Sequence, residues 1–182
     1  MDYFGEDWDD NDFPLAYLIT IRTYGTWLHG DQRTSVDRQD KLNVFGGPKR
    51  AADPKLESKM KDNMIAASFV FNKAQRVTVQ KAIEEVCEHR GYQIKAINVR
   101  TNHVHVVVRV ECKPEKIADT FKSYATRKLR KRNQVSRDRM IWARGRSRRY
   151  LWKPKHVAGA IDYVLYCQGN VSFEEWYESK YT

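Results

Sequence analysis

The sequence predicts an α+β fold of the ferredoxin-like, split βαβ type, with an antiparallel sheet, helices on one face and a C-terminal helix. Three observations favour it. The first two are a valine-rich strand with alternating polarity at residues 101–110 and helical apolar stripes after residues 72, 114 and 155. The third is the order of the segments, which is strand, helix, strand, strand, helix, strand and a final helix.

The strand at residues 101–110 is the centre of this fold. Successive side chains of a strand point to opposite faces, so His103, His105, Val107 and Arg109 share one face. The other face is apolar and consists of valines, namely Val104, Val106, Val108 and Val110. We expect helices to cover the apolar face and the histidine face to be open.

Length and charge limit the domain organisation and the partners. A chain of 182 residues with 41% hydrophobic residues is expected to fold as one domain. We expect an acidic tail at residues 1–13 and a single domain at residues 14–182, with a long loop at about residues 31–71 that has little regular structure up to about residue 60. The net charge of +10 favours an anionic partner, most commonly nucleic acid.

Targeting signals are not apparent in the sequence. The three cysteines form no CxxC pair and are expected to be reduced thiols. No apolar run reaches the roughly 18 residues of a membrane span, and the N-terminus is acidic where a signal peptide would be basic. We expect a cytoplasmic protein with no membrane partner.

Residues 15–24 are rich in strand formers and are expected to be the first core strand. The segment that follows, Trp27-Leu28-His29-Gly30-Asp31, either contacts a ligand or forms a packing corner.

The next helix is capped either by Asn72, with Gln75 three residues later, or by Thr78, and Gly91 ends it. A second strand at residues 92–99 is expected to form a hairpin with the histidine strand.

Cations are concentrated in two later segments. The helix that begins at Pro114 carries a cluster near its end, comprising Arg127, Lys128, Arg130, Lys131 and Arg132. These cations suit either the helix dipole or DNA phosphates. Residues 140–152 are expected to form a strand pair or one bent strand, whose cations and aromatics suit DNA binding, although Trp142 and Trp152 equally suit the core. Its candidate DNA contacts are Arg144, Arg146, Arg148 and Arg149.

The two histidines form a candidate metal site. Their Cα atoms, at i and i+2 of a strand, lie roughly 6.5 to 7 Å apart, close enough for both rings to bind one ion. The alternative is that both are ordinary strand histidines with hydrogen-bond partners. A final helix at about residues 155–168 carries Tyr163 and Tyr166, which are packing residues unless the histidines form a site.

These pieces together resemble a known family. His103-Val104-His105 is similar to the histidine-hydrophobic-histidine motif of the HUH single-strand nucleases, and Tyr163-Val164 resembles their nucleophilic tyrosine. With the 27–31 segment, the 163–169 segment and the order of elements, the chain from Leu15 to Gly169 resembles the REP-associated tyrosine transposases.

The resemblance implies a chemistry. His103, His105 and one further side chain would hold Mg²⁺ or Mn²⁺, which polarises a scissile phosphate in single-stranded, hairpin-bearing DNA. Tyr163 would attack the phosphorus and leave a 5′-phosphotyrosine link and a 3′-hydroxyl. A phenol with a pKa near 10 needs help from the metal or a base. It remains open whether the protein acts as a monomer or as a homodimer.

The third ligand departs from the family pattern. An Asn or Gln is expected four residues after the tyrosine, where this sequence has Cys167. Either a local shift lets Gln168 bind, which we favour, or the ligand comes from elsewhere, and Tyr166 is a lesser candidate nucleophile. Two other interpretations are a non-catalytic nucleic-acid-binding module and a zinc site of His103, His105 and Cys112, which lacks a fourth ligand.

Overall fold

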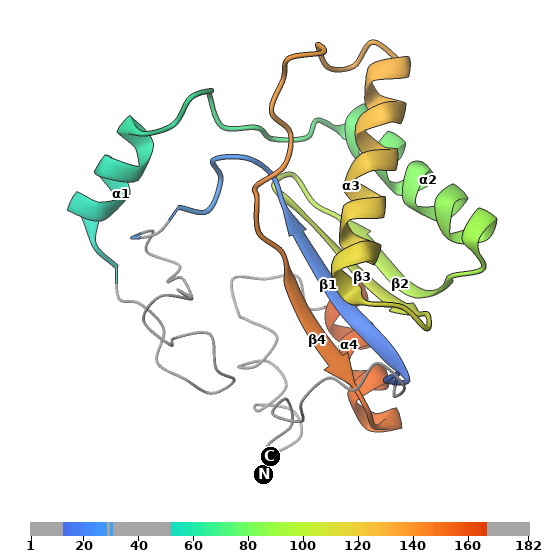
Figure 1. Cartoon of the computed structure of the whole chain (residues 1–182). Coiled ribbons are helices and arrows are strands. Elements are labelled where there is room, and N and C mark those ends of the chain that lie inside the picture. The colour runs from blue at the N-terminus through green and yellow to red at the C-terminus, as the bar shows by residue number, and fades with distance from the viewer. Residues whose placement is uncertain (1–12, 29, 31–51, 167–182) are drawn as a thin grey trace.

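The computed structural model describes residues 13–28, 30 and 52–166 of the chain. Within them, four strands and four helices follow one another as β1 (Ala16–Arg22), α1 (Pro54–Asp62), α2 (Lys73–Arg90), β2 (Gln93–Val99), β3 (His103–Arg109), α3 (Pro114–Lys131), β4 (Ser147–Leu151) and α4 (Pro154–Tyr166) (Figure 1). None of these helices is both long enough and apolar enough to cross a bilayer.

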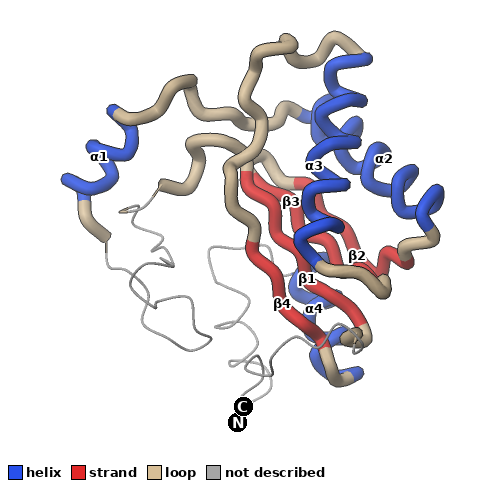
Figure 2. The backbone as a smooth tube through the Cα atoms, viewed as in Figure 1, coloured by secondary structure: helices blue, strands red, loops and turns tan. Residues whose placement is uncertain are grey.

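The four strands form one antiparallel sheet in the order β2-β3-β1-β4. Helices α2 and α3 cover one face of this sheet, and α4 lies behind it on the other (Figures 1 and 2). The predicted α+β, ferredoxin-like fold is therefore confirmed. The expectation of an open histidine face is wrong in one respect, because α4 packs on that face and covers part of it.

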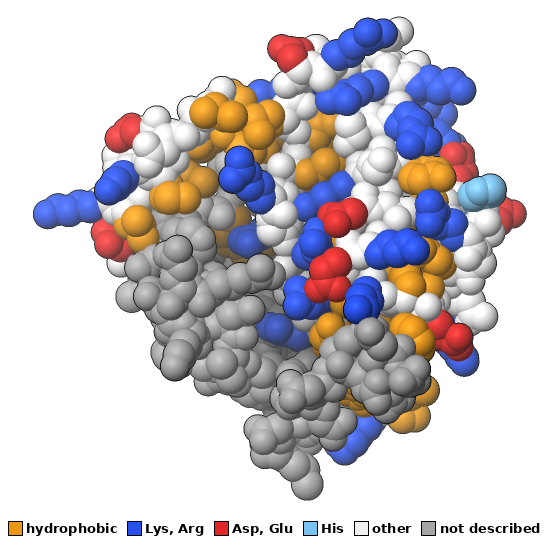
Figure 3. All heavy atoms as spheres, viewed as in Figure 1, with side chains coloured by type: hydrophobic (Ala, Val, Ile, Leu, Met, Phe, Trp, Pro, Cys, Tyr) orange, Lys and Arg blue, Asp and Glu red, His pale blue; other side chains and the backbone are white. Residues whose placement is uncertain are grey.

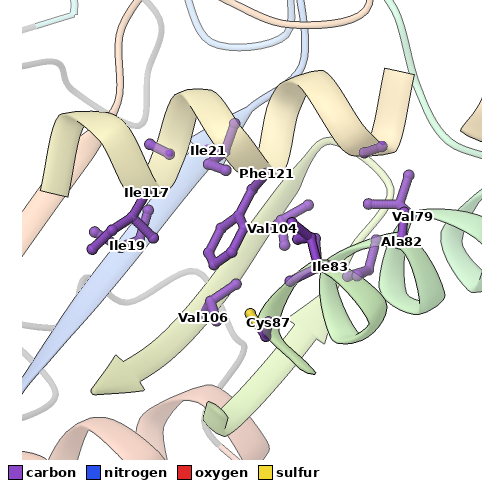
Figure 4. Close-up of a cluster of buried hydrophobic side chains, with 14 of the residues drawn as sticks. Ile19, Ile21, Val79, Ala82, Ile83, Cys87, Val104, Val106, Ile117 and Phe121 are labelled. Atoms are coloured by element: carbon purple, nitrogen blue, oxygen red, sulfur yellow. The ribbon is translucent and has the colours of Figure 1, made fainter. Parts of the chain in front are cut away.

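The main core lies between the sheet and the two helices α2 and α3 (Figure 4). Val104 and Val106 of β3 point toward Phe121 of α3 and Ile83 of α2, and all four side chains are fully buried. The apolar face predicted for β3 is thus the face that the helices cover. Because the valines of β3 face these helices, the side chains that alternate with them, including His103 and His105, lie on the opposite face of the sheet.

A second, smaller core joins α4 to the opposite face of the sheet. Asn98 of β2 fastens the helix there, because its Nδ2 donates a hydrogen bond of 2.9 Å to the carbonyl oxygen of Val164. The buried members of this cluster come from all four strands and from α4, and are Ala16, Leu18, Ala96, Val107, Leu151, Ala160, Tyr163 and Val164.

Local signals explain where the helices begin and end. Asn72 and Gln75 form a reciprocal capping box at the start of α2, so the earlier of the two predicted caps is the one used. Gly91 ends the helix with a φ of 69°, a left-handed conformation that glycine adopts without strain. Both ends are therefore visible in the sequence.

Helix α1 corrects the expectation of little regular structure in the long loop. Asp53 caps it by accepting hydrogen bonds from the backbone N–H groups of Lys55 and Leu56, and Pro54 occupies its first turn. None of its residues is buried, so it has no apolar stripe that would have predicted it. Residues 31–51 of that loop lie outside the described part.

The last strand also differs from both alternatives. Only Ser147–Leu151 forms a strand, while Trp142 makes an isolated bridge with Thr23. Trp142 packs against Phe71 at a ring distance of 5.4 Å and donates a hydrogen bond to Thr126. This tryptophan is therefore part of the packing between α3 and the sheet, as the core alternative predicted.

Candidate active site

The histidine pair occupies an interior strand of the sheet. β3 lies between β1 and β2, so its backbone is hydrogen-bonded on both sides. The rings of His103 and His105 stand on the same face with their centroids 4.5 Å apart and an angle of 69° between their planes. The predicted pairing of the two imidazoles is therefore present in the structure.

His105 is held by the neighbouring strand. Its Cα pairs with Thr20 of β1, and its Nδ1 lies 2.8 Å from the Thr20 hydroxyl oxygen. When Nδ1–H donates to that oxygen, the free lone pair of the neutral ring lies on Nε2. In this tautomer Nε2 can bind a metal. Burial, with smaller effects from His103 and Arg100, lowers the pKa of His105 to about 3, so the ring is neutral at physiological pH.

His103 is oriented by the residue before it. Its Nδ1 lies 2.7 Å from the side-chain oxygen of Asn102. An amide oxygen only accepts hydrogen bonds, so Nδ1 is the donor and the lone pair of the neutral ring again lies on Nε2. With Nδ1 of each ring held in this way, Nε2 is the nitrogen of each imidazole that would bind a metal.

Tyr163 of α4 completes the group on the same face of the sheet. Helix α4 places its ring 5.6 Å from that of His105, with an angle of 71° between the planes. Tyr163 is only 7% exposed, whereas Tyr166 at the end of the same helix is 78% exposed. The structure therefore brings Tyr163, and not Tyr166, to the histidines.

The loop after β1 also reaches the site. Trp27 lies with its ring 5.9 Å from that of His103, while His29 and Asp31 lie outside the described residues. Contact of this segment with a ligand stays a prediction. Gly30 lets the loop approach α1 closely, since a Cβ there would lie 2.4 Å from the carbonyl oxygen of Asp53 and its φ is 93°.

The two imidazoles are the candidate metal donors among the described residues. Among the described residues, no group of three or more His, Cys, Asp or Glu side chains could hold a metal ion. The zinc alternative with Cys112 is therefore wrong, and the Cys112 thiol instead lies 3.8 Å from the Tyr92 hydroxyl. Gln168, the predicted third ligand, lies outside the described residues.

The predicted DNA-binding cations lie mostly on the other side of the sheet, around α3. Figure 3 shows Lys and Arg side chains over the face that α3 occupies. Arg127 and Arg130 line a hollow of about 520 Å³ beside Lys122 and Thr126. The other exposed residues among the predicted DNA-binding cations are Lys131, Arg132 and Arg144. The sequence did not reveal that these groups are separated from the histidines by the sheet.

Three predicted DNA contacts form ion pairs within the protein. Lys128 pairs with Glu85 of α2, while two cations of the final segment pair with carboxylates of α3, as Arg146–Asp119 and Arg148–Glu115. Arg149 lies on the other face of the sheet. It pairs in register with Leu18, whose side chain faces α4, so it stands on the histidine face of the edge strand β4.

Sequence reasoning missed Thr20, Arg22 and Asn98. All three stand on the histidine face, because Thr20 and Arg22 pair with His105 and His103, and Asn98 pairs with His105 from the other side. Alternation along β1 would have grouped Thr20 with Arg22. Their position beside the histidines depends on the register between distant strands, for which the sequence carries no local signal.

The candidate active site thus consists of a histidine pair on an interior strand of the sheet and a tyrosine from a helix on the same face. A family model described as IS200-like transposase matches residues 66–165, which is more than half of the 182-residue chain. The chain therefore belongs to the IS200-like transposase family.

Two solved structures are similar to the chain. A REP-associated tyrosine transposase bound to a REP hairpin is 13% identical, with a TM-score of 0.48 over 88% of this chain and 70% of that chain. A candidate transposase from Deinococcus radiodurans R1 is 11% identical, with a TM-score of 0.43 over 90% of this chain and 97% of that chain. No curated protein matches the sequence.

Proposed function

We propose that the protein is a metal-dependent endonuclease and strand transferase that acts on single-stranded, hairpin-bearing DNA through a 5′-phosphotyrosine intermediate. Membership of a transposase family supports a role in DNA strand transfer. The observation that carries the chemistry is the position of His105, whose ring lies 4.5 Å from His103 and 5.6 Å from Tyr163.

The donor set suits Mg²⁺ or Mn²⁺ in combination with an oxygen ligand. His103 and His105 would bind through Nε2, because Asn102 and Thr20 hold the Nδ1 atoms. Gln168 would supply the third ligand. The bound metal would polarise the scissile phosphate as a Lewis acid.

Tyr163 is the proposed nucleophile. Its phenol oxygen forms a bond to phosphorus while the bond from phosphorus to the 3′-oxygen breaks. The phenol loses a proton and the departing 3′-oxygen gains one, so the step is balanced and leaves a 3′-hydroxyl. Attack of another 3′-hydroxyl on the phosphotyrosine reverses these changes, which joins strands and restores Tyr163.

The charged surface supports the proposed substrate. Arg148 and Arg149 are neighbours on the edge strand β4, and their side chains point to opposite faces of the sheet. A DNA strand that follows the β4 edge would therefore meet cations on both faces. We propose this edge as the route between the surface around α3, which includes Arg127 and Arg130, and the site at Tyr163.

A covalent adduct assay tests the proposal. Purified protein is incubated with labelled single-stranded hairpin DNA and Mn²⁺ and run on a denaturing gel. We expect an adduct with the wild type that is lost with Tyr163→Phe, with His103→Ala and with EDTA. Tyr166→Phe is the matched control and keeps the adduct, because Tyr166 is exposed at the helix end.

Mixing two inactive variants tests the assembly. If the tyrosine acts across a homodimer, then His103→Ala combined with Tyr163→Phe restores adduct formation, because one mixed site has both intact groups. If the tyrosine acts within its own subunit, the mixture stays inactive. Sedimentation of the wild type, measured with and without DNA, shows whether a dimer is present.

Burial at the site favours a second candidate function, a non-catalytic nucleic-acid-binding module. His105 and Tyr163 are only 6% and 7% exposed, as packing residues are. In that case the cations around α3 bind DNA and the histidines are structural. DNA binding without an adduct across a broad hairpin library would establish this function in place of the first.

A further inference from the structure

Arg22 stands beside the histidine pair but has no role in the proposed chemistry so far. It is the last residue of β1, and its Cα pairs directly with that of His103. Residues that face each other across an antiparallel pair point to the same side of the sheet. The Arg22 side chain therefore leaves the sheet on the face of His103 and His105.

Trp27 lies close to both Arg22 and His103. The Arg22 guanidinium carbon lies over the Trp27 ring, 5.4 Å from its centroid, and the same ring is 5.9 Å from His103. A cation over the face of tryptophan is attracted by the ring and held in place. The loop that carries Trp27 thereby fixes the guanidinium next to the candidate metal ligands.

The charge of Arg22 lacks a counter-ion in the described part of the chain. No carboxylate among residues 13–28, 30 and 52–166 forms an ion pair with it. Burial lowers the pKa of Arg22, although a guanidinium stays protonated at any physiological pH. Sequestering a cation from water in this way is costly unless an anion completes the site.

We propose that Arg22 is the phosphate-binding residue of the candidate active site, where its guanidinium binds non-bridging oxygens of the DNA phosphate that Tyr163 attacks, and that Trp27 is its positioning residue. The inference rests on the proposed function for the identity of that phosphate. The planar guanidinium matches two phosphate oxygens at once, which a lysine ammonium does not. Charge that develops on those oxygens during attack is stabilised by a donor already in place.

Inorganic phosphate tests the site without cleavage. Metal-free protein in EDTA is titrated with phosphate at fixed pH and ionic strength, and NMR follows the ring nitrogens of His103 and His105. We expect a saturable shift of the His103 signals that weakens at least about tenfold in Arg22→Gln, because the charged donor is gone. Arg109→Gln is the matched control, since Arg109 is an exposed cation at the end of β3 that lies farthest from His103.

Adduct formation tests the role in catalysis. At saturating DNA, Arg22→Gln is expected to lower the rate by about 100-fold or more, as loss of a transition-state donor does. Arg22→Lys keeps the charge without the two-pronged geometry and is expected to fall between Arg22→Gln and the wild type. Arg109→Gln is expected to react like the wild type.

Folding of each variant is checked by circular dichroism. If Arg22→Gln is unfolded, Trp27→Leu tests the same site, because it keeps the guanidinium but removes the ring that holds it. We expect weaker phosphate binding and slower adduct formation in this variant. Trp27→Leu with wild-type values for both would overturn the positioning role of Trp27.

The outcomes separate this inference from the proposed function. Phosphate shifts that depend on Arg22, in a protein that forms no adduct with any hairpin, would retain the phosphate site and reject the nuclease. Adduct formation by a folded Arg22→Gln at the wild-type rate would retain the nuclease and overturn the role of Arg22. Phosphate shifts that are equal in the wild type and in Arg22→Gln would overturn it as well.

Discussion

The two faces of the sheet differ in the side chains that line them. The face toward α2 and α3 is apolar at its centre, with Val104, Val106 and Phe121 fully buried, whereas the face toward α4 combines a small apolar cluster with two imidazoles and a tyrosine. The same strand, β3, supplies side chains to both. Stability is therefore expected to depend mainly on one face and chemistry on the other, which the following substitutions test.

The largest expected effect is on the α3 face. Phe121→Ala removes a fully buried aromatic ring, which typically lowers the free energy of unfolding by about 3–5 kcal/mol. Val164→Ala, equally buried on the α4 face, removes fewer atoms and is expected to cost about 1–2 kcal/mol. Urea unfolding followed by circular dichroism measures both, and equal losses would contradict the division between the faces.

Thr20→Val is expected to affect metal binding more than stability. It keeps the size of the side chain but removes the oxygen that lies 2.8 Å from His105 Nδ1. Loss of such a partner typically lowers metal affinity by about 10–100-fold. Calorimetric titration with Mn²⁺ measures this, and Thr20→Ser, which keeps the hydroxyl, should bind like the wild type. Wild-type affinity in Thr20→Val would show that the hydroxyl does not orient the ring.

The protonation of His105 is expected to make stability depend on pH. Its folded pKa, about 3, lies below the ordinary value of 6.5, so the unfolded chain binds the proton more tightly. The stabilisation is present above pH 6.5 and is lost as pH falls toward 3, by about 1.4 kcal/mol for each pH unit.

Urea unfolding in EDTA between pH 7.5 and 5 measures this slope. His156, whose pKa burial also lowers, contributes in the same direction, so His105→Gln is compared with the wild type to isolate one group. We expect a shallower slope in the variant. Identical slopes would mean that His105 is as exposed to protons in the folded protein as in the unfolded chain.

The smallest expected effect concerns the ion pairs beside α3. Arg148 and Glu115 are partly exposed and 3.0 Å apart, and such pairs contribute less than about 1 kcal/mol. Arg148→Gln should therefore leave the unfolding midpoint nearly unchanged and should lower DNA affinity and its salt dependence. Glu115→Gln is the matched control, because it breaks the same pair but keeps the cation.

Features that depend on residues close together in the chain were predicted from the sequence, and features that depend on residues far apart in the chain were not. The capping box of Asn72 and Gln75 and the alternation of His103 with Val104 are local patterns, and the structure confirms them. Helix α1 was missed because most of its residues are polar and none is buried. Local pattern thus predicts elements that bury a face and overlooks those that do not.

The site was predictable only in part for the same reason. The spacing of His103 and His105 and the resemblance of Tyr163 to a family tyrosine were readable in the chain. The roles of Thr20 and Arg22 depend on pairing with a strand about eighty residues later, which no local pattern encodes. The ion pairs of Lys128, Arg146 and Arg148 likewise require the packed structure.

The unbroken pairing of β1 with β3, from Tyr17↔Val108 to Arg22↔His103, also bears on misfolding. A slip of one residue in β3 would exchange its two faces and bury both imidazoles against α2 and α3. Polar rings without partners in that apolar layer would destabilise the misregistered sheet. The alternation that places the histidines beside Tyr163 thus also disfavours a one-residue slip of register during folding.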